Sequence, residues 1–141
     1  MATLFTKIIN GEIPGRFVWR DERSVAFLTI APLADGHVLV VPIAEVDHWI
    51  DLEPDDVAHL MAVSQQIGTV LQRTFQPARV GVMIVGEEVP HTHIHLIPFR
   101  SLAQLDFANA DNSPDPDHLD VIAEQIRVGL RADGHVSVVP D

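Results

Sequence analysis

The sequence contains no cysteine among its 141 residues. This absence excludes disulfide bonds, thiolate zinc sites, iron–sulfur ligation and a cysteine nucleophile. Positive charge is also scarce, because nine Lys or Arg stand against 20 Asp or Glu and the formal net charge is −11. Such a deficit argues against a surface that coats DNA or RNA and against binding to an anionic membrane, since both need clustered Lys and Arg.

Long apolar runs are missing as well. A membrane-spanning helix needs about 20 apolar residues, and the best run, residues 38–44, has seven. Near the N-terminus Lys7, Asn10 and Glu12 interrupt any apolar stretch, so we expect no signal peptide. The sequence predicts a soluble, cytoplasmic protein with a single domain over residues 1–141, large enough to bury a core without covalent staples.

Five segments are predicted to be β-strands. Each is short, rich in β-branched or aromatic residues, and bounded by Gly, Pro or polar turn residues. They are residues 17–20, 25–28, 37–41, 79–85 and 93–98. The first two flank a polar loop and form a hairpin, and the last two are close enough in sequence to pair antiparallel.

Residues 54–75 are predicted to form the main helix. Asp55 and Asp56 lie in its first turn, where the helix dipole favours acids, and Pro77 prevents its continuation. Apolar and small residues recur at spacings of three and four, which marks one face of a helix. These residues are Val57, Leu60, Met61, Ser64, Ile67, Gly68 and Leu71. We expect this face to pack against the sheet.

Shorter helical segments are predicted at the two ends of the chain, at residues 4–9 and 116–132. Residues 101–117 look irregular, and a stretch of that length is usually functional or mobile. The predicted fold is α+β: a five-stranded antiparallel sheet with one long helix and a C-terminal helix. Its core covers residues 4–100, and an irregular loop with the last helix covers residues 101–141.

Three of the eight histidines, His91, His93 and His95, fall within five residues. Side chains alternate faces along a strand, so these imidazoles project from one face while Ile94 and Leu96 project from the other. Burying a polar group without a partner costs about 1–3 kcal/mol. A row of histidines therefore brings nothing to a core, and the pattern indicates a functional site.

Two kinds of chemistry use such a row. In a metal site, His-x-His on a strand and a distant histidine offer three imidazoles to zinc. In covalent catalysis, a neutral imidazole nitrogen acts as the nucleophile, and an unperturbed pKa of about 6.5 keeps histidine mostly neutral at pH 7. The residues alone leave both possibilities open.

Residues 91–97 resemble the signature of the histidine triad (HIT) family of nucleotide hydrolases and transferases, in which three histidines alternate with apolar residues. Residues 5–14 are similar to the N-terminal block of that family, and residues 26–33 and 36–42 to its central block. The pattern of the whole chain, including residues 105–110, further resembles actinobacterial HIT proteins.

This resemblance implies an enzyme that cleaves a phosphoramidate, phosphoanhydride or similar bond at the α-phosphate of a nucleotide, with no metal and no other cofactor. By analogy, His93 attacks the phosphate and carries the nucleotidyl intermediate, and His95 contacts the phosphate. His91 sets the orientation of the site through its strand, and His37 supports the same network.

The resemblance also implies an apolar slot for the base. The matching residues are Phe5, Ile8, Phe27 and Leu28, with Ile30 nearby. Thr29 stands where many members carry an Asp that binds both ribose hydroxyls. In the loop before the triad, Glu87 and Glu88 replace a Gln and a Ser or Thr that donate to the phosphates. A carboxylate beside a phosphate is repulsive unless it is protonated or turned away.

Some bacterial members bind structural zinc through Cys-x-x-Cys near the N-terminus, but the matching residues here are Thr3 and Thr6, so we expect no such site. The implied partners are a purine nucleotide or nucleotide conjugate and a second copy of the chain in a homodimer. Neither a nucleic acid polymer nor a membrane is expected. Two alternatives stay open: a non-catalytic nucleotide-binding or sensor protein, and a metal-binding histidine site.

Overall fold

The computed structural model describes residues 2–140, which contain three α-helices and five strands. In chain order these are α1 (Leu4–Ile9), β1 (Phe17–Arg20), β2 (Ser24–Leu28), β3 (Val38–Pro42), α2 (Pro54–Phe75), β4 (Arg79–Met83), β5 (Ile94–Phe99) and α3 (Pro116–Ala132). Short 3₁₀ turns lie at Trp49–Asp51, Leu102–Leu105 and Phe107–Asn109. No helix within residues 2–140 has both the length and the apolar character needed to cross a bilayer.

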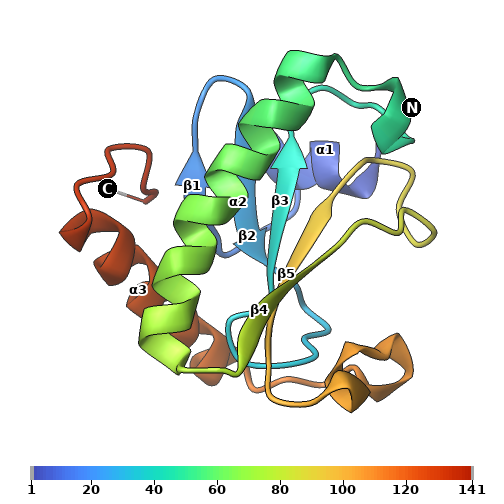
Figure 1. Ribbon diagram of the computed structural model, residues 1–141. Helices are drawn as coiled ribbons and strands as arrows, with labels where there is room; N and C mark the ends of the chain where they lie inside the picture. The colour runs from blue at the N-terminus through green and yellow to red at the C-terminus, as the bar shows by residue number, and fades with distance from the viewer. Residues whose placement is uncertain (1, 141) are drawn as a thin grey trace.

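The five strands form one antiparallel sheet in the order β1-β2-β3-β5-β4 (Figure 1). The predicted α+β fold is therefore confirmed, with its five-stranded antiparallel sheet, its long helix and its C-terminal helix. Both long helices begin with a proline, whose missing N–H is harmless in the first turn of a helix.

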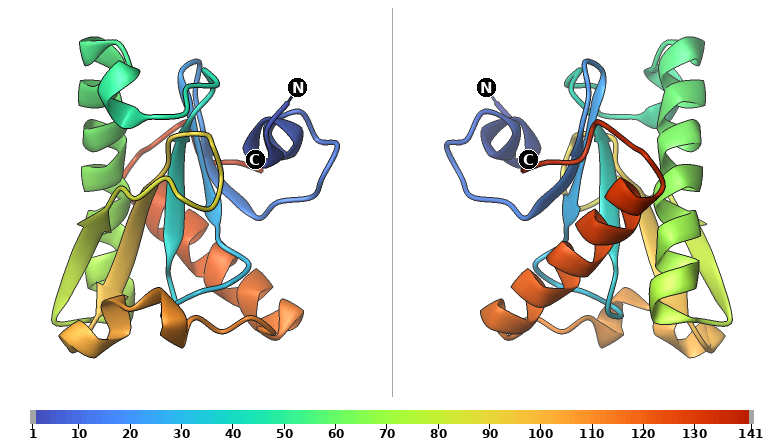
Figure 2. Two further views of the ribbon diagram at one scale, coloured as in Figure 1. Left: turned by 90° about the vertical axis from the view of Figure 1, so that its right-hand side faces the viewer. Right: turned by 90° about the vertical axis from the view of Figure 1, so that its left-hand side faces the viewer.

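The sheet separates two layers of helices that differ in size (Figure 2). Helices α2 and α3 pack on one face, and the short helix α1 packs on the other. The strands divide their side chains with the expected period of two. In β3, Val38 and Val40 face the long helices, whereas Leu39 and Val41 face α1.

The buried face of α2 differs from the one expected from its sequence pattern. Leu60 and Ile67 are buried as predicted, but Met61 is 43% exposed, and Val63 and Val70 are buried instead. The cause is α3, which packs alongside α2. The two helices approach so closely that a Cβ on Gly129 would meet a methyl group of Val70 at 2.5 Å. Helix α2 therefore buries one side against the sheet and another against α3.

Strand β5 begins at Ile94, so His91 and His93 lie just before the strand rather than in it. Pairing between β3 and β5 stops at Val40 and Ile94. Two residues further along β3, Pro42 has no N–H for the ladder, and its carbonyl accepts a hydrogen bond from the ring of His91 at 2.8 Å. Before β5 the chain is held by this side-chain bond and by the backbone N–H of Thr92, which donates to the carbonyl oxygen of Val46 at 2.8 Å.

Candidate active site

The four histidines predicted to be functional are buried together on the α1 face of the sheet. His95 lies directly opposite Leu39 in the sheet register, which fixes the face on which it projects. The ring of His95 lies 4.8 Å from the ring of His93 and 5.2 Å from the ring of His37, measured between centroids. His91 lies behind His93 and contacts the ring of Phe5.

The tautomer of His93 follows from one hydrogen bond. Its Nδ1 lies 2.8 Å from the backbone carbonyl oxygen of His91. A carbonyl only accepts hydrogen bonds, so Nδ1 carries the proton and Nε2 of the neutral ring carries the lone pair. Phe5 packs edge-on against the ring at 4.8 Å and limits its rotation. His93 therefore offers Nε2 as a fixed nucleophilic atom.

A chain of hydrogen bonds sets the protonation of His95 in the same way. The backbone N–H of Leu33 donates to Nδ1 of His37 at 3.0 Å, so the proton of His37 is on its Nε2. That atom lies 3.0 Å from Nδ1 of His95 and donates to it. The remaining nitrogen of His95, Nε2, therefore carries a proton. Within residues 2–140 it is the one buried side-chain polar atom without a hydrogen-bond partner.

The electrostatics of these rings agree with this arrangement. Burial, followed by the repulsion that a protonated His93 would exert, lowers the pKa of His37 to about 4. The same causes, with a further contribution from His37, lower the pKa of His95 to about 3. Both rings are therefore neutral at pH 7, and each carries the single proton that the chain of hydrogen bonds requires.

His91 is held by the first turn of α1. Its Nε2–H donates to Pro42, as described above, so Nδ1 accepts a hydrogen bond from the hydroxyl of Thr3 at 2.8 Å. Thr3 also caps α1, where it accepts from the backbone N–H of Thr6 at 3.1 Å. The hydroxyl of Thr6 in turn donates to Glu45 at 2.7 Å. This network positions the backbone carbonyl of His91 that fixes the nucleophilic ring.

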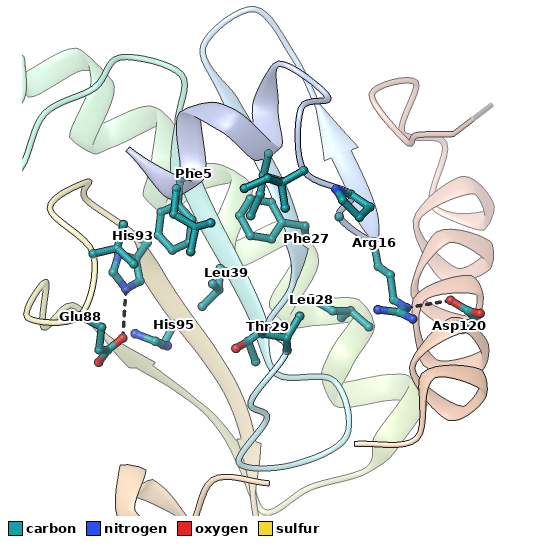
Figure 3. A pocket seen from close by; sticks show the side chains of 17 residues that line it. Phe5, Arg16, Phe27, Leu28, Thr29, Leu39, Glu88, His93, His95 and Asp120 are labelled. Atoms are coloured by element: carbon teal, nitrogen blue, oxygen red, sulfur yellow. Dashed lines mark hydrogen bonds and ion pairs between the residues drawn. The ribbon is translucent and has the colours of Figure 1, made fainter. Parts of the chain in front are cut away.

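A cavity of about 660 Å³ opens beside these rings, within the usual size range of small-molecule sites. Figure 3 shows His93, His95 and Glu88 at one end of the cavity, and Arg16 paired with Asp120 at the other. The Nε–Oδ1 distance of that ion pair is 2.7 Å. Most of the wall between the two ends is apolar, and it includes Phe5, Ile8, Ile13, Phe27, Leu28, Leu39 and Val89.

The sequence matches the family model of the HIT domain over residues 10–102, which is more than half of the chain. The chain belongs to the HIT family. It is 34% identical over 99 residues to an uncharacterized HIT-like protein of Methanocaldococcus jannaschii, a match that covers 67% of this chain and 77% of that protein.

Two further relatives extend the comparison. A bis(5'-nucleosyl)-tetraphosphatase of Schizosaccharomyces pombe is 31% identical over 98 residues, covering 66% of this chain and 52% of the yeast enzyme. The crystal structure of a zinc-bound histidine triad family protein from Mycobacterium smegmatis superposes with a TM-score of 0.81 at 26% identity, covering 95% of this chain and 96% of that one. The HIT relatives of this chain thus include one named nucleotide hydrolase, the yeast tetraphosphatase.

In this HIT protein the cavity includes most of the residues predicted to bind substrate. Those at the cavity wall are Phe5, Ile8, Phe27, Leu28, Thr29 and Glu88, with Ile30 beside them. Glu87 is exposed and does not line the cavity, although it is next to Glu88 in the same loop. His37 and His91 lie behind the cavity wall and act on it through the rings of His95 and His93.

Several residues at the site were not predicted from the sequence. Leu39 has the pattern of an ordinary core residue. Arg16 and Asp120 are 104 positions apart, and nothing in the sequence connects them. Phe107 lies in the irregular segment after β5, and its ring is 4.9 Å from that of His95. The resemblance of residues 105–110 to actinobacterial HIT proteins was a signal in the sequence, but it assigned no role to Phe107.

Proposed function

We propose that this HIT protein is a nucleotide hydrolase or transferase that cleaves a phosphoramidate, phosphoanhydride or similar bond at the α-phosphate through a nucleotidyl-His93 intermediate. The observation that carries the proposal is the pair of facing ring nitrogens. Nε2 of His93 has a free lone pair, whereas Nε2 of His95 has a proton and no partner within residues 2–140. One is suited to attack phosphorus and the other to donate to a phosphoryl oxygen.

The two steps of the reaction follow from these protonation states. The lone pair on Nε2 of His93 attacks the α-phosphorus, and the bond to the leaving group breaks on the opposite side of the phosphorus. A phosphate leaves as its anion, and an amine leaves after taking a proton from the solvent at the open side of the cavity. The N–H of His95 donates to the oxygen on which negative charge develops, an arrangement that typically contributes several kcal/mol to catalysis. In the second step water or another acceptor attacks phosphorus, and the N–P bond breaks to regenerate His93.

A purine nucleotide or nucleotide conjugate suits the shape of the cavity. The base would lie in the apolar slot, against the rings of Phe5 and Phe27, whose centroids are 5.6 Å apart. The phosphate would lie at the histidine end. Between them Thr29 offers one hydroxyl to the ribose. The similarity to the yeast bis(5'-nucleosyl)-tetraphosphatase supports a substrate that contains a nucleotide.

The protonation of His95 also bears on the metal alternative. A carboxylate oxygen of Glu88 and one nitrogen each of His93 and His95 lie within 4.8 Å of one another, close enough to consider a cation. To bind a cation, Nε2 of His95 must lose its proton, so the proton of His95 must move to Nδ1. His37 could then no longer donate to that atom, and its own proton would have to move from Nε2 to Nδ1. Nδ1 of His37 accepts a hydrogen bond from the N–H of Leu33, so a proton on Nδ1 would face a second donor. The arrangement therefore fits a phosphate oxygen and does not fit a cation.

The decisive experiment tests whether the protein forms a covalent adduct. Purified protein is incubated with a panel of nucleoside phosphoramidates and dinucleoside polyphosphates, quenched in base and analysed by intact-mass spectrometry. We expect a nucleotidyl adduct and turnover, both abolished in His93→Asn, whose amide keeps the hydrogen bond to His91 but lacks Nε2. His48→Asn, which changes an exposed histidine away from the cavity, is the control.

Other outcomes identify the alternatives. Thermal stabilisation by nucleotide that persists in His93→Asn, with no turnover by the unsubstituted protein, would indicate a sensor. Stoichiometric bound zinc together with loss of activity on chelation would indicate a metal site. Absence of both adduct and His93-dependent turnover across the panel rules out the covalent hydrolase.

We also propose, from the resemblance to other HIT proteins, that the protein is a cytoplasmic homodimer. Light scattering coupled to size-exclusion chromatography is expected to give twice the chain mass of 15.5 kDa. A mass of one chain at micromolar concentration would contradict the homodimer.

A further inference from the structure

We propose that Glu88 is a catalytic residue, the general base that removes a proton from the water that hydrolyses nucleotidyl-His93. This inference rests on the proposed function. It gives a role to a carboxylate that otherwise only repels the substrate phosphate. The argument depends on where the side chain lies and on which other groups could accept a proton.

Glu88 lies over the nucleophilic atom. Its Oε2 is 3.7 Å from Nε2 of His93, too long for a hydrogen bond. The side chain of His93 is 1% exposed and that of Glu88 is 52% exposed, so the carboxylate lies on the solvent side of the nucleophile. No hydrogen bond within residues 2–140 holds the carboxylate. It can therefore turn aside to admit a phosphate and remain near the α-phosphorus.

In-line displacement determines where the water arrives. The leaving group departs from the side of phosphorus opposite Nε2 of His93, and the hydrolytic water approaches from that same side. Because Glu88 covers Nε2 from the solvent, its carboxylate lies toward this side. The geometry puts a proton acceptor where the attacking water must lose its proton.

The other titratable groups at the cavity cannot accept that proton. In the intermediate, Nε2 of His93 is bonded to phosphorus and Nδ1 is protonated against the carbonyl of His91. Nε2 of His95 already carries a proton. Of the cavity-lining residues within 2–140, Glu88 and Asp120 are the two carboxylates, and Asp120 is paired with Arg16 at the far end. Glu88 is the remaining acceptor.

The proposed step is balanced in atoms and charge. The water oxygen forms a bond to phosphorus while one of its protons moves to the carboxylate of Glu88. The N–P bond breaks, and its electron pair returns to Nε2 of His93. The nucleoside monophosphate leaves, and Glu88 loses its proton to the solvent, to which the side chain is half exposed.

The test compares the two chemical steps in Glu88→Gln, using the full-length protein with adenosine and guanosine 5′-phosphoramidates. Rapid quench measures the burst of released ammonia, and intact-mass spectrometry measures the adduct. We expect an intact burst, an adduct that accumulates toward one per chain, and a kcat lowered by about 100-fold or more, the usual contribution of a general base. KM is expected to stay the same or fall, because a repulsive charge has been removed.

Two controls make the result specific. Glu22→Gln removes the same charge from an exposed turn between β1 and β2, and it is expected to behave like the unsubstituted protein. Formate added to Glu88→Ala is expected to restore part of the turnover, because a small carboxylate can occupy the vacated space. A residue with a purely structural role would show neither adduct accumulation nor rescue.

The inference and the proposed function fail in different ways. If Glu88→Gln turns over at the unsubstituted rate without accumulating adduct, while His93→Asn is inactive, Glu88 is not the base and the covalent mechanism stands. If Glu88→Gln also loses the burst, Glu88 acts before hydrolysis and the inference is wrong. If the unsubstituted protein forms no adduct and shows no His93-dependent turnover, both proposals are overturned.

Discussion

The two faces of the sheet use the same strands for different purposes. On the face covered by α2 and α3, side chains such as Val40, Ile94 and Leu96 form a closed apolar core. On the face covered by α1, the neighbouring positions Leu39 and His95 border an open cavity. Helix α1 has six residues, compared with 22 in α2, so it leaves part of its face uncovered.

This difference shows how a small α+β domain can separate stability from chemistry. The long helices bury apolar surface, which is the main source of folding free energy. The polar groups on the other face are buried at a cost that their hydrogen bonds to one another offset. Substitutions on the first face should therefore change stability, whereas those on the second should change catalysis.

The largest expected effect on stability comes from the helix face. Ile67 in α2 is fully buried, and Ile67→Ala should lower the free energy of unfolding by about 2–5 kcal/mol, because it removes buried methyl groups and leaves a cavity. The rate per folded molecule should hardly change. Met61→Ala on the same helix is the control, since this exposed side chain should cost less than about 1 kcal/mol. Equal losses of unfolding free energy for the two variants in urea would contradict the exposed position of Met61.

The histidine face should respond in the opposite way. In His95→Asn the side chain keeps a polar atom near His37 but loses the donor at Nε2, so turnover should fall about 10²–10³-fold. His95→Gln is the matched variant, because its longer amide can donate from near the position of Nε2 and should retain more activity. Steady-state kinetics on the phosphoramidate panel measures both. Equal activities in the two variants would remove the donor role.

The buried histidines should also make stability depend on pH. His37 and His95 have folded-state pKa values of about 4 and about 3, below the unfolded value of about 6.5. Their neutral forms are therefore fully compatible with folding above pH 6.5. As the pH falls toward 4, the unfolded chain binds protons that the folded protein does not, and each ring can remove up to about 1.4 kcal/mol of stability per pH unit.

Urea unfolding at pH 7, 6 and 5 measures this loss. Acidic groups also titrate at low pH, so the comparison is with the double variant His37→Gln/His95→Gln, in which the contribution of the two rings is absent. The double variant should lose less stability between pH 7 and pH 5 than the unsubstituted protein. The same pH dependence in both proteins would show that these rings are not held neutral by the fold.

The smallest expected effect concerns the link between the two regions at the start of α1. Thr3→Val removes both the cap of α1 and the donor to His91, and should cost about 1–2 kcal/mol of stability. Thr3→Ser keeps the hydroxyl and should cost little. Thermal unfolding of the two variants measures the difference, and turnover should fall less than tenfold in either. Identical melting temperatures would show that the Thr3 hydroxyl does not contribute to stability.

Much of the fold could be predicted because its signals are local. Helices α2 and α3 occupy the predicted residues, since each starts at a proline and ends near a residue that stops a helix. The face of α2 was predicted less well, because burial of Val63 and Val70 depends on α3, which comes more than 40 residues later. Periodicity in one helix carries no information about a second helix that packs beside it.

The candidate site divides in the same way. The spacing of His91, His93 and His95 indicated a site because it is a property of a short segment, whereas His37 and the apolar slot were predicted only from the resemblance to the HIT family. The structure brings the four histidines together and puts most of the slot residues at the cavity wall. Only the tertiary structure decided where the protons lie. Leu33 and Pro42 act through backbone groups, and these can meet an imidazole only after distant parts of the chain have packed together. The sequence states which residues are histidines, whereas the nitrogen that carries the proton in each ring depends on the groups that pack against it.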